Sequence, residues 1–149
     1  MRVINFIIGC ILLTLTTLAT NSFATIGEVS ISTGSAVIDR KDGKADVKVK
    51  KELDVFSYDT VKTGNGKVGI KFIDDTRVDV TEHSKLVIDE FVYDPNTKTG
   101  SLSLKATLGT VRYASGQIAK NSKQNVKIST PTATIAVRGT DFAMTVNEI

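Results

Sequence analysis

Residues 67–80 read KVGIKFIDDTRVDV and carry the clearest structural pattern of this 149-residue chain. Apolar side chains alternate with polar or small ones along 67–72 and again along 77–80. Alternation with a period of two places one face of a strand on a core and the other in water. Asp74 and Asp75, between the two runs, suit a tight turn. The stretch is therefore predicted to form two strands joined by that turn.

The same alternation recurs to the end of the chain, for example along 102–106, 126–128 and 142–146. Turn residues separate these runs at short, fairly even spacing, and no apolar stripe with helical spacing follows residue 25. The polar stretch 114–124 is expected to be a hairpin tip or a crossing loop. The pattern predicts an all-β domain of about ten short strands, with a solenoid-like roll and a sandwich both open.

The first 24 residues differ from the rest. They hold one charged residue, Arg2, an apolar run and a final Ser22-Phe23-Ala24, which is the layout of a signal peptide cleaved after Ala24. The domains expected are a signal-peptide helix over 1–24 and an all-β domain over 25–149. An uncleaved anchor and a lipoprotein modified at Cys10 are the alternatives. The protein is predicted to be periplasmic or secreted.

Charge argues against nucleic-acid binding. The formal net charge of +3 falls to +2 once Arg2 leaves with the signal peptide, and the remaining lysines are dispersed over strand faces. Cleavage also removes Cys10, the single cysteine, so no disulfide or thiol chemistry is expected. No membrane association is predicted after cleavage.

Catalytic patterns are sparse. His83 is the single histidine, so a multi-histidine metal site is excluded, and no nucleophile elbow, phosphate loop or dinucleotide fingerprint occurs. We therefore predict no enzymatic activity, no cofactor, no metal and no catalytic residue.

The most distinctive segment is residues 130–142, TPTATIAVRGTDF. Pro131 favours a strand that starts just after it, and Gly139 allows a sharp turn before Phe142 returns to the core. Arg138 and Asp141 flank that turn and are predicted to form an ion pair across it. Two interpretations stay open: a structural staple, or an edge that faces a partner.

This segment resembles the TPxATxxVRGTxF-like motif of the FecR domain family. The matching residues are Thr130, Pro131, Thr132, Ala133, Thr134, Val137, Arg138, Gly139, Thr140, Asp141 and Phe142. Weaker support comes from a GDxVxTG-like stretch and an SxLxI-like stretch. They supply Asp59, Val61, Thr63, Gly64, Ser84, Leu86 and Ile88. The resemblance extends over about residues 26–146, including Ile26–Val29 at the start.

Two departures stand out: Tyr58 replaces the usual glycine of the first stretch, and Asp75 replaces the glycine of an Asp-Gly turn, where aspartate still tolerates the left-handed region. The resemblance implies an extracytoplasmic module that binds a protein partner or takes part in signalling. The cytoplasmic helical domain of the family's anti-sigma regulators has no counterpart, so direct sigma-factor control is not expected. A structural or adhesive envelope component that self-associates through sheet edges is the alternative.

Overall fold

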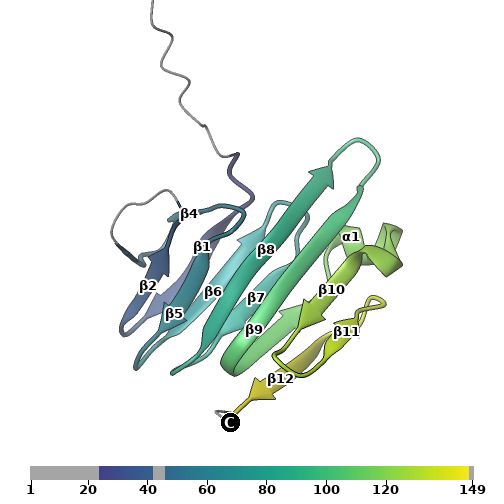
Figure 1. Cartoon of the computed structure of the whole chain (residues 1–149). Coiled ribbons are helices and arrows are strands. Elements are labelled where there is room, and N and C mark those ends of the chain that lie inside the picture. The colour runs from purple at the N-terminus through teal and green to yellow at the C-terminus, as the bar shows by residue number, and fades with distance from the viewer. Residues whose placement is uncertain (1–23, 42–45, 148–149) are drawn as a thin grey trace, which may run out of the picture.

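The computed structural model describes residues 24–41 and 46–147, and these form twelve strands and two short helices (Figure 1). The predicted signal-peptide helix lies outside the described residues, apart from Ala24 at its end. The strands are β1 (Gly27–Thr33), β2 (Ala36–Asp39), β3 (Val47–Lys48), β4 (Asp54–Val55), β5 (Thr60–Thr63), β6 (Lys67–Phe72), β7 (Arg77–Val80), β8 (Lys85–Asp94), β9 (Thr99–Ala114), β10 (Val126–Ser129), β11 (Thr134–Ala136) and β12 (Phe142–Val146). The helices are α1 (Gln117–Asn121) and the 3₁₀ helix η1 (Lys123–Asn125).

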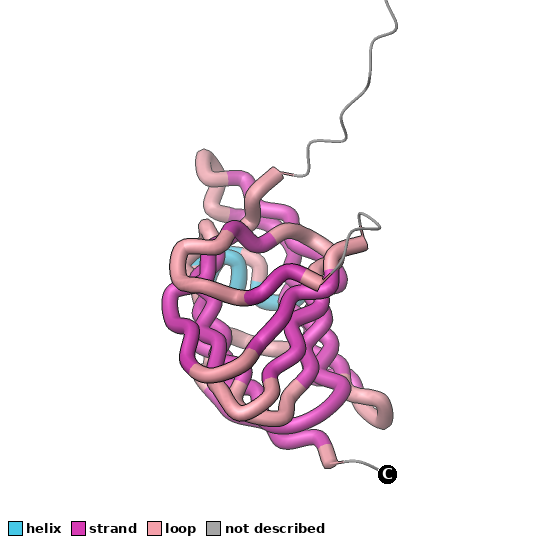
Figure 2. The backbone as a smooth tube through the Cα atoms, turned by 90° about the vertical axis from the view of Figure 1, so that its left-hand side faces the viewer, coloured by secondary structure: helices cyan, strands magenta, loops and turns pink. Residues whose placement is uncertain are grey.

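All twelve strands belong to one sheet that curls into a half-barrel, and Figure 2 shows this curvature. Strand β9 is shared by two halves of this sheet. Half A, as named here, has the order β4-β1-β6-β7-β9-β12, and half B has the order β3-β2-β5-β8-β9-β10-β11. The last residues of β9 pair with β7 and β12, whereas its first residues pair with β8 and β10.

The inward side chains of the two halves meet in one core. Along residues 67–80 the predicted alternation is confirmed: Ile70 pairs with Val78, and both are at most 1% exposed. Phe72 stacks on Phe91 with ring centroids 5.2 Å apart, which joins β6 of half A to β8 of half B. The all-β prediction is confirmed, although the arrangement does not confirm a solenoid.

The connection from β9 to β10 differs from the expected loop. Residues 117–121 form α1, whose Ile118 and Ala119 are fully buried. A single turn of helix is too short for a 3.6-residue pattern to appear in the sequence. The helix also lets β10 return parallel to β9, whereas the other strand pairs are antiparallel. No helix within 24–41 and 46–147 is long and apolar enough to span a membrane.

Candidate functional site

The segment 130–142 starts as a hairpin turn between β10 and β11. The Thr130 hydroxyl oxygen accepts hydrogen bonds from Thr132 N at 3.4 Å and Ala133 N at 3.1 Å. Thr130 N donates to the carbonyl of Ala133 at 2.8 Å, which closes the turn. Pro131 occupies a turn position that needs no donor, and β11 then begins at Thr134, close to where the proline predicted a strand.

The chain next crosses from half B to half A. Val137 is the buried member of the segment, at 3% exposure, and its N–H donates to the carbonyl of Val126. Gly139 has a φ of 75°, as the predicted sharp turn requires. Phe142 then packs against Tyr113 of β9, with ring centroids 5.5 Å apart. Most other residues of the segment are exposed, including Arg138 and Thr140.

The predicted ion pair between Arg138 and Asp141 is wrong, because no such pair exists among the described residues. Asp141 Oδ1 instead accepts a hydrogen bond of 2.8 Å from Ser115 N, and Ser115 Oγ donates to the carbonyl of Thr140 at 3.3 Å. Both bonds tie the start of β12 to the end of β9. The sequence suggests an opposite charge close by, whereas the partner in the structure lies 26 residues away along the chain.

Strands β11 and β12 are two of the four terminal strands of the described sheet, the other two being β3 and β4. Strand β11 pairs with β10 alone, and β12 with β9 alone. Both edge strands lack proline and charged side chains, the features that commonly protect exposed edges. Their apolar side chains are incompletely covered: Ile135 is 39% exposed, and Met144 and Val146 are half-buried. A hollow of 290 Å³ lies between the 130–132 turn and residues 145–147.

The supporting motif has a different setting, since its side chains point inward. Thr63 and Ser84 are at most 9% exposed, and Thr63 Oγ1 accepts a hydrogen bond of 2.9 Å from Ser84 N. Ser84 Oγ accepts from Thr110 N at 3.0 Å and donates to the carbonyl of Glu82 at 3.0 Å. This hydroxyl cluster holds the end of β5, the turn before β8 and the middle of β9 together.

The rest of the supporting motif is also buried or in a turn. Val61, Leu86 and Ile88 are fully buried core residues. Asp59 is 2% exposed, and its Oδ2 accepts a hydrogen bond of 3.0 Å from Phe56 N and lies 3.8 Å from Arg40 Nε. These positions support the folded sheet and do not join the exposed segment 130–142 in one site. Gly64 continues the turn, with its N–H donating to the carbonyl of Ser35.

Asp74 is an anchor that sequence reasoning missed in part. A local hydrogen bond stabilises the predicted turn, since Asp74 Oδ1 accepts from Thr76 N at 3.0 Å. Through Oδ2, the fully buried carboxylate also accepts a hydrogen bond of 3.2 Å from Ile118 N, which caps the start of α1. The carbonyl of Asp74 accepts from Gln117 N at 2.7 Å. The glycine that precedes α1, Gly116, was a hint of this close contact in the sequence. In the structure, a Cβ at position 116 would lie 2.3 Å from Thr76 N.

Tyr113 lies beside this anchor on β9. It is 2% exposed, and its hydroxyl lies close to the Ser115 and Thr76 hydroxyls without a well-aligned hydrogen bond to any described residue. Burial raises the pKa of Tyr113 above its ordinary value of 10.0. The phenol is therefore held in its protonated form, and it is a packing residue beside Phe142.

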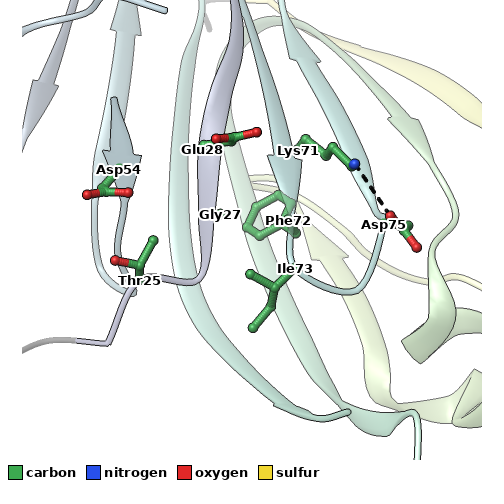
Figure 3. A pocket seen from close by; sticks show the side chains of 8 residues that line it. All are labelled: Thr25, Gly27, Glu28, Asp54, Lys71, Phe72, Ile73 and Asp75. Atoms are coloured by element: carbon green, nitrogen blue, oxygen red, sulfur yellow. Dashed lines mark ion pairs between the residues drawn. The ribbon is translucent and has the colours of Figure 1, made fainter. Parts of the chain in front are cut away.

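A shallow hollow of 220 Å³ opens where β1, β4 and β6 come together (Figure 3). Lys71 points toward Asp75, with Nζ 3.6 Å from Oδ1, while Glu28 and Asp54 lie on the other side. Nowhere in the described part of the chain do three or more histidine, cysteine or acidic residues gather as metal ligands. His83, the single histidine of the sequence, is exposed.

Comparison with protein families adds a decisive observation. Residues 59–148 match the family described as FecR protein, which covers more than half of the chain. The chain belongs to the FecR family. The matched region begins at Asp59 and includes the hydroxyl cluster, the Asp74 anchor and both edge strands β11 and β12. The resemblance of Ile26–Val29 lies before it. A search of curated proteins and a search of solved structures found no significant match.

FecR proteins are a regulatory and signalling family. The two departures from the family pattern have a common backbone explanation. Tyr58 has a φ of 71° and Asp75 a φ of 66°, so both positions have the left-handed conformation that glycine adopts most easily. The expectation that Asp75 tolerates this region is confirmed. These two turns therefore have a backbone conformation that favours glycine, with residues that adopt it less easily.

Proposed function

We propose that this FecR protein is a non-catalytic, extracytoplasmic module that binds a protein partner in signalling. The family match supports a signalling role, and the leader-like sequence of residues 1–24 supports export. The matched region contains buried structural polar residues and an exposed C-terminal segment, an arrangement suited to binding.

The observation that carries the proposal is the unpaired edge of β12, Phe142–Val146, a terminal strand of the sheet. One side of β12 is paired with β9, so its other side presents backbone donors and acceptors. The half-buried Met144 and Val146 lie next to that edge. An extended segment of a partner that pairs with β12 would satisfy the backbone groups and cover these side chains.

Site-specific photo-crosslinking tests this function. A photoreactive phenylalanine analogue replaces exposed Thr145 on β12 in one variant and exposed Thr97 in the turn between β8 and β9 in the matched control. Both full-length variants are expressed in the natural host and irradiated. A discrete heterologous adduct from position 145 alone is expected. No adduct from either position, or the same adducts from both, would contradict the proposal.

A second candidate is a structural envelope component that self-associates through sheet edges. The observation in its favour is that the sheet also ends in the short strands β3 and β4, so each half has an edge at both ends. Light scattering of the purified chain at rising concentration distinguishes the candidates. Growth of mass with concentration would favour self-association, and a constant monomer mass would exclude it.

A further inference from the structure

The outward face of half A combines basic side chains with a hollow. The outward positions lie in rows across β1, β6, β7, β9 and β12, because these strands are in antiparallel register. In one row Lys71 faces Arg77, and in the next Asp79 faces Arg112. Arg77 and Arg112 are therefore diagonal neighbours on adjacent strands, within reach of a common ligand.

Arg77 and Arg112 both carry a positive charge that is open to a ligand. Neither forms an ion pair with any residue in the described part of the chain, and both are exposed. Asp79, the acidic residue between them, has its carboxylate 2.9 Å from Lys67 Nζ on the other side. A guanidinium presents a planar fork of donors that matches a carboxylate. The two arginines thus present two such sets of donors on the outward face of half A.

The face also has room for a chain segment. A hollow of 470 Å³ runs over β1, β6, β7 and β9. The small residue Ala114 lines it, and Gly69 pairs with two other lining residues, Ile31 and Asp79. A Cβ at position 69 would lie 3.0 Å from Asp79 Oδ1, so the absence of a side chain keeps the space open. Ile31, 44% exposed, supplies an apolar contact at one end.

We propose that this face, defined by Ile31, Gly69, Lys71, Arg77 and Arg112, binds an acidic peptide segment of a protein partner. The inference rests on the proposed function and adds to it a second surface and the chemistry of the partner. Carboxylates of the segment bind Arg77 and Arg112 while its backbone lies along the hollow. Arginine distinguishes half A from half B: on half B the outward Lys62 is already paired with Asp39 at 2.9 Å, and the outward Lys105 and Lys127 are point charges without the planar donor geometry of a guanidinium.

Fluorescence anisotropy tests the inference with the full chain, expressed with its own leader and purified as the host processes it. The probe is a labelled octapeptide of alternating Glu and Ala, and the matched probe has Gln in place of Glu. The test variant is Arg77→Gln with Arg112→Gln. The control is Lys105→Gln with Lys127→Gln, which removes two exposed charges from the outward face of half B. Melting temperatures establish that both variants are folded.

We expect the Arg77→Gln, Arg112→Gln variant to bind the acidic probe about tenfold more weakly, and the control to bind it as wild type does. The wild-type affinity should fall as salt is added, and the Gln probe should bind weakly. Equal affinity for both double variants, or for both probes, would overturn the inference. That result would leave the β12 crosslink intact, whereas loss of the crosslink with retained peptide binding would instead contradict the proposed function.

Discussion

Tyr58 and Asp75 have positive φ values of 71° and 66°, although each carries a side chain. The left-handed region costs a residue with a Cβ about 1–2 kcal/mol, less for aspartate. We therefore expect Tyr58→Gly to be more stable than Tyr58→Ala by about 1 kcal/mol, because both lose the ring and only glycine relieves the strain. Likewise, Asp75→Gly should be more stable than Asp75→Ala. Urea denaturation measures both, and equal stability within either pair would contradict the backbone explanation.

Gly109 and Gly139 separate conformational strain from steric overlap. Their φ values are nearly equal, 76° and 75°, yet a Cβ at 109 would lie 2.1 Å from Ser84 Oγ and one at 139 no closer than 3.7 Å to Ala119 O. Gly139→Ala should cost about 1 kcal/mol from the backbone alone. Gly109→Ala should cost at least about 2 kcal/mol more, because the clash breaks the hydroxyl cluster. Similar losses in chemical denaturation would show that the cluster yields easily.

Tyr113 predicts a pH dependence of stability. Its pKa is raised above 10.0 in the fold, so the unfolded chain loses this proton first as the pH rises. The stabilisation from keeping the phenol neutral is present below about pH 10 and is lost above it. Tyr113→Phe should stay within about 1 kcal/mol of wild type near pH 8, since the hydroxyl makes no well-aligned hydrogen bond to a described residue, and should lose less stability above pH 10. Parallel decline of the two proteins would refute the assignment.

At the scale of elements, Asp74 connects the β6–β7 turn to α1. Asp74→Ala removes the acceptor for Thr76 N and Ile118 N and leaves both donors buried, so we expect a loss of about 2–4 kcal/mol. Hydrogen exchange at Ile118 should accelerate more than exchange in β5, which is remote from the anchor. Exposed Asp89→Ala serves as the control and should change little. Unchanged protection at Ile118 would show that α1 docks without this cap.

The elements also show what the sequence determines. The alternation of 67–80 predicted β6, β7 and their turn because the information is local. Within each strand, the apolar residues, such as Ile70 and Val78, all point to the same buried face. Helix α1 escaped prediction because five residues hold no helical period, and its start is capped by Asp74, far away along the chain. The partner of Asp141 escaped for the same reason, since Ser115 reaches it through tertiary structure.

For the whole molecule, the all-β class and the family motif could be predicted, but the location of the exposed edges could not. The exposed edges depend on which strands pair. Strand β9 belongs to both halves, and β10 pairs with it in parallel, which leaves β11 and β12 as terminal strands of the two halves. Burial then divides the motif residues into inward ones such as Ser84 and outward ones such as Thr134.

The whole-molecule proposal is that a partner strand pairs with the open β12 edge. Thr145→Pro removes a backbone donor from this edge strand, and Thr145→Ala is the matched control that keeps it. Ala143 lies two residues before Thr145 in β12, so its N–H faces the same side of the strand, and Ala143→Pro provides a second test. Each variant is first compared with wild type by its melting temperature, because β12 also pairs with β9.

The most direct measurement is co-purification of the partner with the full chain after chemical crosslinking in the natural host, quantified by mass spectrometry relative to the amount of FecR protein. The proposal predicts that at least one of the folded proline variants loses most of the partner recovered with wild type, while Thr145→Ala retains it. Full recovery by both folded proline variants, or no partner with wild type, would contradict binding at the β12 edge.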